Sequence, residues 1–590
     1  MLFSTFCTFL CALTTRAAAQ AASVPQSIVL SGAILTSKWF EGSDHVQILE
    51  LVVTNKDDEN PILREHKLTV TASSDDLEVV STAEVRRLLP GQATVVQVGV
   101  RNKNNVTQGA QCSAKVVAKW GSDKSSEAAV SGLCGFPDYS ASADSLSRHW
   151  APQWFNDAKF GIFIHWGIYA VPAYGNLPPN QDYSEWYWKR QHEPDYKSQT
   201  YQYHLNTYGP DLDYDDFMSN FTASNFDADE WMKLIDDAGA RYFVPVTKHH
   251  DGWAIFDVPK ESSLRSTVNY GPKRDFLREL FDVAKSGYSH IRRGTYFSLP
   301  EWYHPGFAQY SFTWGGGFPG GPPTNPYTGD EIEYTGFVEV DDFIVDVQAP
   351  QMKSLAYDYE TELMWCDIGG ANNSTEVLSE WLNWASSQGR QVAYNNRCGI
   401  GASDFTTPEY STYPDIVVKT WETNRGMDPF SFGYNFQTPN SEYLTGEDIV
   451  LTLVDVVSKN GNFLLDIGPE ADGSIPAIMQ TGLRDAGKWI HEHSESIFST
   501  RFWQKTAGQG SVRYTTTSSA FYIHIISKPN STVTIEDPIP YLSGDDVTVV
   551  GGDLDGNVVG SELVNGSLVL DLSDAVIAAD RYVWTFKISY

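Results

Sequence analysis

Near both ends of the chain, apolar and polar residues alternate over short runs. Examples are VQILELVVT at 46–54 and SAFYIHIIS at 519–527, and turn-rich stretches such as NKDDENP at 55–61 separate such runs. Alternation at a period of two, without a long amphipathic helix, is typical of antiparallel strands. We therefore predict an N-terminal β-sandwich over residues 25–135 and a C-terminal β-sandwich over residues 505–590.

Residues 145–500 follow a different pattern, in which strand-like apolar runs alternate with helix-like segments. The strand-like runs span residues 160–166, 241–250, 292–299, 361–367, 390–397, 415–422 and 462–468. The helix-like segments span residues 227–240, 275–287, 342–359, 375–389 and 447–461. Such a repeat predicts a parallel sheet, either closed as a (β/α)8-like barrel or left open and doubly wound. Because no G-x-G-x-x-G fingerprint follows the first strand, we favour the barrel. The predicted fold class is α/β, a (β/α)8-like barrel flanked by two β-sandwiches.

Most of the predicted central strands end in polar or aromatic residues. The endings are, in order, His165-Trp166, Lys248-His249-His250-Asp251, Glu301-Trp302, Trp365-Cys366-Asp367, Asn396-Arg397 and Trp421-Glu422. A single Asp after a strand is often the N-cap of the next helix. In a barrel, however, the carboxyl ends of the strands converge on one face, where active sites form. Six such endings therefore predict a site that combines carboxylates with His, Trp, Arg and Asn, a set that suits a hydroxyl-rich ligand.

The net charge and the N-terminal residues indicate which partners and which cellular compartment to expect. The 590 residues include 74 Asp and Glu against 42 Lys and Arg, a formal net charge of -32. Such a surface repels phosphate backbones and anionic membranes, so we expect neither nucleic acid nor a membrane as a partner. The start, MLFSTFCTFLCALTTRAAA, joins a short apolar run to small residues. This pattern predicts a signal peptide over residues 1–19, cut after Ala19 or Ala22, and hence a secreted protein.

Secretion changes how the cysteines and asparagines are interpreted. Cys7 and Cys11 leave with the signal peptide, so four cysteines remain. Cys112 and Cys134 lie in one β-rich segment and are predicted to pair, whereas Cys366 and Cys398 either pair or stay reduced. Asn-x-Ser/Thr triplets, which accept N-linked glycans in secreted chains, occur at Asn105, Asn220, Asn372, Asn373, Asn530 and Asn565.

Several longer motifs resemble glycoside hydrolase family 29, the α-L-fucosidases. They are WFNDAKFGIFIHWGIYAVPAYG at 154–175, SEWYW at 184–188, KHHDGWAIFD at 248–257, WCDIGG at 365–370, SFGYN at 431–435 and DVVSKNGNFLLDIGPEADGSIP at 455–476. The motifs stand in the family's order, and the resemblance covers residues 145–590. The chain is thereby identified as a secreted, fungal-like member, with the N-terminal β module as an addition outside the resemblance.

The resemblance implies chemistry on two carboxyl groups. Family members are retaining enzymes that use no metal or cofactor and form a covalent fucosyl-enzyme on an Asp. The matching residue here is Asp367, and the best match to the acid/base is Glu409, with Glu422 as its competitor. The residues that match sugar contacts are His165, Glu185, Trp186, His249, His250, Tyr296 (or Phe297 beside it), Trp365, Arg397 and Phe432. We expect an exo-acting retaining α-L-fucosidase acting on fucosylated glycans, with its carboxyl groups about 5–5.5 Å apart.

Other interpretations of the same residues stay open. His249-His250-Asp251 contains metal-binding residue types. Neighbouring strand residues point to opposite faces, however, so we expect one His in the pocket and the other hydrogen-bonded below it. Asp251, Asp466 and Asp472 lie in stretches that favour turns. The alternative functions are a retaining glycosidase for a galactose-like sugar and a secreted carbohydrate-binding protein without catalysis.

Overall fold

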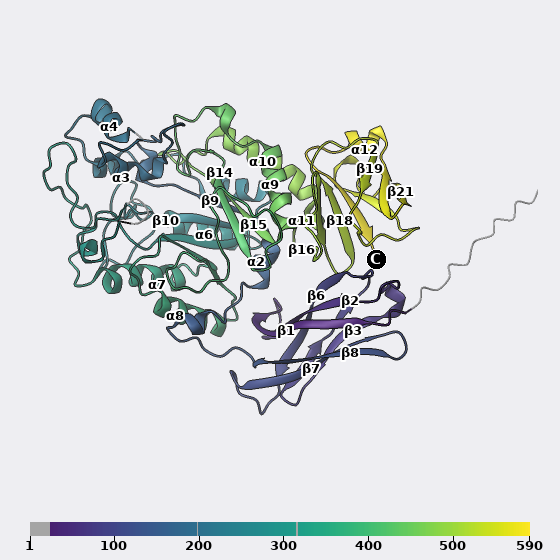
Figure 1. The fold of residues 1–590 in the computed structure, drawn as a ribbon. Coiled ribbons are helices and arrows are strands. Elements are labelled where there is room, and N and C mark those ends of the chain that lie inside the picture. Colours follow the sequence, from purple (N-terminus) through teal and green to yellow (C-terminus); the bar gives the residue numbers. More distant parts are fainter. Residues whose placement is uncertain (1–23, 198, 314–316) are drawn as a thin grey trace, which may run out of the picture.

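The computed structural model describes residues 24–197, 199–313 and 317–590. The predicted signal peptide, residues 1–19, lies outside the described residues. Figure 1 shows two β-rich regions, formed by the first and last parts of the chain, against a larger region of mixed helices and strands. The fold class predicted from the sequence is confirmed.

The N-terminal region is a sandwich of two antiparallel four-stranded sheets. One sheet has the order β1 (Ile28–Trp39), β2 (Gln47–Asn55), β6 (Ala93–Asn102), β4 (Leu77–Ser81). The other has the order β5 (Ala83–Val85), β3 (Leu68–Ser73), β7 (Gln111–Trp120), β8 (Lys124–Leu133). Inward-facing residues of both sheets, Leu49, Val98 and Val116 among them, form one apolar core. The predicted disulfide between Cys112 and Cys134 is present and ties β7 to the residue after β8.

Seven parallel strands form the central sheet. Their spatial order is β13 (Ala393–Tyr394), β12 (Leu363–Asp367), β11 (Arg292–Ser298), β10 (Tyr242–Lys248), β9 (Phe160–Ile164), β15 (Gly461–Ile467), β14 (Trp421–Gly426). Isolated parallel bridges join the segment 405–409 to both edges of this sheet, pairing Asn395 with Phe405, Thr406 with Trp421 and Glu409 with Asn424. The segment therefore lies between the edge strands β13 and β14. It takes the place of an eighth barrel strand and brings Glu409 into the sheet.

Helices that follow the strands cover the outside of the barrel (Figure 1). They are α5 (Ala228–Asp237), α6 (Phe276–Gly287), α7 (Ala349–Tyr357), α8 (Ser374–Ser387), α9 (Gly446–Ser458) and α10 (Ala477–Glu492). The other α-helices of the described residues are α1 (Ala143–Leu146), α2 (Gln153–Ala158), α3 (Tyr187–Gln191), α4 (Thr200–Tyr208), α11 (Ser494–Ile497) and, in the C-terminal region, α12 (Asp574–Ala578). Side-chain caps fix their starts: Asp227 accepts a hydrogen bond from Glu230 N, and Asp275 from Arg278 N.

All five predicted helices are present, but one strand is misplaced. The prediction set a strand over residues 415–422, whereas β14 begins at Trp421, and Val418 in the apolar run before it is 82% exposed. The polar residues WETNRG form the strand instead, because hydrogen bonds satisfy them: Glu422 accepts from the Tyr242 hydroxyl of β10 at 2.6 Å, and Thr423 donates to Ser411 O of the neighbouring segment at 2.7 Å. Glu422 is consequently near the amino end of its strand, not at the carboxyl end as predicted.

The C-terminal region is an antiparallel sheet of eight strands. Their order is β16 (Arg501–Phe502), β17 (Val512–Thr516), β18 (Ala520–Ile525), β23 (Trp584–Ser589), β20 (Val547–Val550), β21 (Val558–Val564), β22 (Ser567–Asp571), β19 (Thr532–Ile535). One core contains Ile523 of β18 and Ile535 of β19, from distant places in this order, so the sheet folds over as a sandwich. Arg87 pairs with Asp545 and thereby joins the two β regions.

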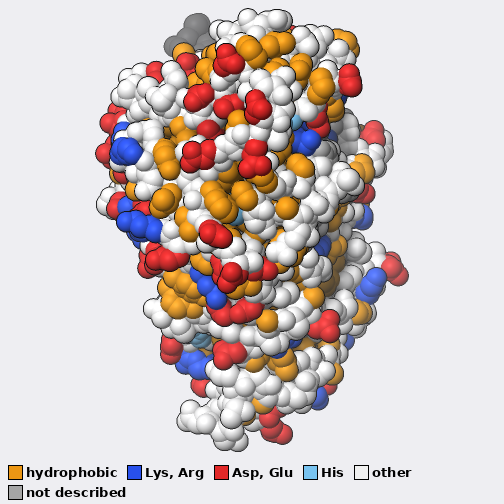
Figure 2. All heavy atoms as spheres, turned by 90° about the vertical axis from the view of Figure 1, so that its left-hand side faces the viewer, with side chains coloured by type: hydrophobic (Ala, Val, Ile, Leu, Met, Phe, Trp, Pro, Cys, Tyr) orange, Lys and Arg blue, Asp and Glu red, His pale blue; other side chains and the backbone are white. Residues whose placement is uncertain are grey.

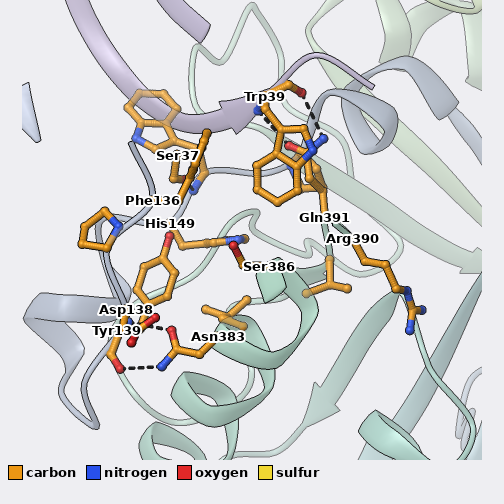
Figure 3. Close-up of a pocket in the computed structure, with 15 residues that line it drawn as sticks. Ser37, Trp39, Phe136, Asp138, Tyr139, His149, Asn383, Ser386, Arg390 and Gln391 are labelled. Carbon is orange, nitrogen blue, oxygen red and sulfur yellow. Dashed lines mark hydrogen bonds between the residues drawn. The ribbon is translucent and has the colours of Figure 1, made fainter. Parts of the chain in front are cut away.

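The N-terminal sandwich also docks on the barrel, through residues drawn in Figure 3. Gln391, just before β13, accepts a hydrogen bond from Trp39 N at 3.0 Å and donates one to Trp39 O at 3.0 Å. Asn383 in α8 makes the same exchange with the backbone of Tyr139, at 2.7 and 2.9 Å. Each side-chain amide thus replaces a missing backbone partner, so docking leaves these polar groups satisfied.

The surface carries the excess of acidic residues that the composition implies. Figure 2 shows Asp and Glu side chains spread over one face, with fewer Lys and Arg among them. Within the described residues, no helix combines the length and apolar character needed to cross a membrane. Four sequon asparagines are exposed, namely Asn105, Asn220, Asn530 and Asn565. Asn372 and Asn373 are partly exposed, and their amides donate to Gly370 O and to the Glu376 carboxylate.

Candidate active site

A pocket of about 480 Å³ includes residues that end or follow the barrel strands β9, β10 and β12. It is lined by all eleven predicted site residues: His165, Glu185, Trp186, His249, His250, Tyr296, Trp365, Asp367, Arg397, Glu409 and Phe432. The lining also contains Tyr183 and Asn424, which the sequence interpretation missed. Glu422 does not belong to the lining. Four of the six predicted strand endings thus meet at this pocket, whereas Glu301-Trp302 and Trp421-Glu422 contribute no residue to its lining.

Asp367 is the last residue of β12, and three donors hold its carboxylate. Tyr296 in β11 donates its hydroxyl to Oδ2 at 2.8 Å. Oδ1 accepts hydrogen bonds from Ile368 N at 2.9 Å and from Arg397 Nη1 at 3.0 Å. Three hydrogen bonds from different directions leave the carboxyl group little freedom to rotate. Asp367 is thus held in one orientation at the pocket, as a nucleophile has to be.

Arg397 links the two candidate carboxyl groups. Its Nη1 atom lies 3.0 Å from Asp367 Oδ1 and 3.2 Å from Glu409 Oε2. Those two oxygens are therefore at most about 6 Å apart, below the ~6.5–9.5 Å of inverting glycosidases and compatible with the ~5–5.5 Å of retaining ones. Thr407 anchors the guanidinium, since its hydroxyl oxygen accepts from Nε and its carbonyl oxygen from Nη2, each at 2.9 Å.

Glu409 has the properties of a proton donor. Burial raises the pKa of Glu409, and the Asp367 charge acts in the same direction, while Arg397 opposes both. A carboxyl group with a raised pKa keeps its proton to higher pH, which suits a general acid. Tyr183 also hydrogen-bonds to Glu409. Its place one residue before the SEWYW motif was the only signal in the sequence that could have indicated it.

Two histidines of the pocket are oriented by other side chains. His165 Nδ1 lies 2.6 Å from Asp466 Oδ1, so Asp466 is a partner of His165 rather than the turn residue expected. His250 Nδ1 lies 2.6 Å from Ser298 Oγ, which itself donates to Pro300 O at 2.7 Å. Ser298 must therefore accept from His250, and His250 Nε2 presents a lone pair in the neutral ring. Burial holds the pKa of both histidines well below the usual value, so both are neutral.

The expectation that only one of His249 and His250 would line the pocket is wrong. Strand β10 ends at Lys248, so the alternation of strand side chains no longer governs the two residues that follow. Within the described residues, no group of three or more His, Cys, Asp or Glu side chains is arranged to hold a metal ion. Asp251 and Asp472 each accept a backbone N–H from two residues on, as turn residues do.

Glu185 adds a protonated carboxyl group to the pocket. Burial raises the pKa of Glu185 to about 8, although Gly433 N donates to its Oε2 at 2.9 Å. At neutral pH the group is therefore mostly protonated and able to donate to a hydroxyl. Phe432 stacks on His165 with the ring centroids 4.9 Å apart, and Trp186 packs edge-on against another histidine ring. These faces suit the C–H surfaces of a sugar.

Glu422 lies in the barrel interior. It is fully buried, and its carboxyl accepts hydrogen bonds from the Tyr242 hydroxyl at 2.6 Å and from Trp365 Nε1 at 2.9 Å. The Trp365 ring lines the pocket and lies beneath the Arg397 guanidinium, 4.7 Å from ring centroid to Cζ. Glu422 therefore contacts the pocket residue Trp365 from the side that faces away from the pocket. This location favours Glu409 as the second reacting carboxyl group.

A disulfide joins Cys366 to Cys398, which resolves the alternative that the sequence left open. Cys366 directly precedes Asp367 in β12, and Cys398 directly follows Arg397. Both cysteines are fully buried. The cross-link therefore lies immediately behind the contact between the Asp367 carboxylate and the Arg397 guanidinium.

The chain is similar to known fucosidases over most of its length. A family model described as alpha-L-fucosidase matches residues 135–495. Plasma alpha-L-fucosidase of Rattus norvegicus is 33% identical over 376 residues, which are 62% of this chain and 74% of that protein. Tissue alpha-L-fucosidase of Homo sapiens is 31% identical over 466 residues, 76% of this chain and 92% of that protein. The crystal structure of Thermotoga maritima alpha-fucosidase with a mechanism-based inhibitor superposes with a TM-score of 0.64 at 28% identity, covering 77% of this chain and 100% of that one. The chain belongs to the α-L-fucosidase family.

Proposed function

We propose that this chain is a retaining, exo-acting α-L-fucosidase that removes terminal α-L-fucosyl residues from oligosaccharides or glycoconjugates. The observation that carries the proposal is the Arg397 guanidinium, which contacts both Asp367 and Glu409 in one pocket. The short distance between these carboxyl groups supports a double displacement. The family to which the chain belongs supports fucose as the sugar.

In the first step, the Asp367 carboxylate attacks the anomeric carbon of the fucosyl unit, and the bond to the leaving oxygen breaks. Glu409 donates its proton to this oxygen, so the departing glycan leaves as an alcohol. The raised pKa of Glu409, which burial causes, supports a protonated starting state. Tyr296 and Arg397 hold Asp367 in place while its charge is lost to the ester bond.

In the second step, Glu409 acts as a base. It takes a proton from a water molecule, whose oxygen attacks the anomeric carbon and releases the Asp367 carboxylate. Two displacements at one carbon restore the starting configuration. Arg397 serves both steps, because it stays within hydrogen-bond distance of each carboxyl group.

The remaining pocket residues support recognition of a small hydroxylated sugar. The neutral histidines and the protonated Glu185 offer donors and acceptors in fixed directions. Phe432 and Trp365 offer apolar faces for the C–H surface and the methyl group of fucose. Because a pocket admits the end of a glycan, it supports exo action.

The test is kinetic and stereochemical. The wild type should hydrolyse an aryl α-L-fucoside, release α-L-fucose first in a proton NMR time course, and leave matched aryl galactosides unchanged. Asp367→Ala should abolish turnover, and azide should restore activity to Glu409→Ala. A protein that binds fucose without turnover and forms no ester with a 2-fluoro-fucosyl donor would refute catalysis. Galactoside turnover that exceeds fucoside turnover would refute the sugar.

The proposal includes export. The two disulfides support an oxidising compartment, as does the signal-like sequence of residues 1–19. Protein collected from the medium of a eukaryotic host should begin at Gln20 or Ser23 and lose mass on treatment with an N-glycosidase. Intracellular retention with residues 1–19 still attached would contradict this part of the proposal.

A further inference from the structure

The strand that carries Asp367 loses its backbone partner on one side before it reaches the pocket: β11 pairs with it as far as Asp367, but β13 does not. The last ladder pair between β12 and β13 is Met364 with Tyr394, three residues short of the nucleophile. Beyond it, a side chain continues the pairing: Asn395 Oδ1 accepts from Cys366 N at 3.0 Å, and Asn395 Nδ2 donates to Cys366 O at 3.0 Å. The side chain of the same residue, Cys366, is bonded to Cys398, so a covalent link joins this strand end to the loop after β13. On the β13 side, covalent and side-chain links thus replace the sheet where the reacting groups begin.

The turn just after this point is strained. Ile368 has a φ of +73°, a region that β-branched residues rarely adopt. In this conformation its N–H points at Asp367 Oδ1, 2.9 Å away. Gly369 and Gly399 follow with positive φ and lie in close contact, because a Cβ built on Gly369 would lie 3.3 Å from Gly399 Cα. The two loops that leave the disulfide therefore run side by side in a shape that local preferences alone would not hold.

We propose that the Cys366–Cys398 disulfide is a positioning device for the reaction. It fixes the strand end that carries Asp367 to the loop that carries Arg397, so that Arg397 reaches both carboxyl groups and the strained Ile368 N–H stays on the nucleophile. The inference rests on the roles proposed for Asp367 and Glu409. Both sulfur atoms are buried, so the cysteines act through their neighbours and do not touch the substrate.

The decisive variant is Cys366→Ala/Cys398→Ala, and the matched control is Cys112→Ala/Cys134→Ala, which removes the disulfide of the remote N-terminal sandwich. The first variant should lose about 10–100-fold in kcat, the size of effect that a shift of about 1 Å in a reacting group produces, with KM changed less than threefold. Its basic pH limb should move to higher pH, because Arg397 lowers the pKa of Glu409 only while held beside it. The control should melt earlier but keep its kcat and its basic limb.

Two further measurements test the role of the Cys366–Cys398 disulfide, even if the first variant folds poorly. Wild-type enzyme can be reduced with dithiothreitol, and alkylation with peptide mapping then gives the fraction with the Cys366–Cys398 bond open. Activity should fall in step with that fraction and not with opening of the other disulfide. Adding Ile368→Gly to the first variant should recover part of the lost kcat, because glycine adopts the turn without strain.

The results separate this inference from the proposed function. An inactive wild type would refute both. An active wild type whose Cys366–Cys398 bond can be removed or opened without change in kcat and in the basic limb would overturn the inference alone. Equal kcat losses in the two disulfide variants would also overturn it, because they would show a general effect on folding.

Discussion

Glu422→Gln tests the position of the carboxyl group that competes with Glu409. Glu422 is fully buried between the Tyr242 hydroxyl and the Trp365 indole N–H. Burial raises its pKa from 4.5 to about 7. The folded chain therefore binds a proton that the unfolded chain has released between these two pH values. The stability that this proton contributes is fully present below pH ~4.5 and is lost as pH rises through about 7.

The magnitude follows from the two pKa values. The difference between 4.5 and about 7 corresponds to about 3 kcal/mol of unfolding free energy, at 1.36 kcal/mol per pH unit. Gln has no proton to lose, so Glu422→Gln should match the wild type near pH 4.5 and exceed it by about 3 kcal/mol above pH ~7. For a barrel of about 350 residues, this difference amounts to about 4 °C in Tm.

The assay is thermal unfolding of both proteins followed by circular dichroism between pH 4 and 8.5, together with kcat at 25 °C. Glu422→Gln should keep kcat within about threefold of the wild type, while Glu409→Gln should lose about a hundredfold or more. A Tm difference that does not change with pH, or one that favours the wild type at high pH, would refute the reasoning about burial. Loss of kcat in Glu422→Gln with recovery by azide in Glu422→Ala would make Glu422 the acid/base.

Three further variants test other contacts. Tyr183→Phe removes a hydrogen bond that lowers the pKa of Glu409, so the basic limb of kcat/KM should move to higher pH; a profile that stays in place would contradict this contact. Asp466→Ala removes the 2.6 Å contact that orients His165, and steady-state kinetics should show KM rising about tenfold, or about 1.4 kcal/mol of binding, with a smaller change in kcat. Gln391→Ala leaves two backbone groups unpaired where the N-terminal sandwich docks. Denaturant unfolding should show a loss of about 2–4 kcal/mol with kcat unchanged, and a drop in kcat would show that the sandwich acts on the site.

Sequence patterns predicted the fold best where a segment carries a continuous apolar run or one apolar face. Strand β9 is an apolar run buried at all five positions, helix α6 combines an apolar face with a cap at Asp275, and both lie where predicted. The pattern failed at β14, because hydrogen bonds to Tyr242 of β10 and to the neighbouring segment satisfy its polar residues, so the strand forms without an apolar run. The segment 405–409 pairs with the sheet through isolated bridges and not through a continuous ladder, so no periodicity in the sequence could mark it as a strand.

By itself, the sequence determined the fold class, the family and the residue types that meet at the pocket. The order of the strand endings implies this meeting, because parallel strands in a barrel place their carboxyl ends on one face. Only the tertiary structure decided that Glu409 contacts Arg397 while Glu422 contacts Trp365 from within the barrel. It also decided that Cys366 is bonded to a cysteine 32 residues away. The reason is that the direction of a side chain and the pairing of cysteines depend on contacts between distant segments. Residue type and the order of strands in the chain can be taken directly from the sequence.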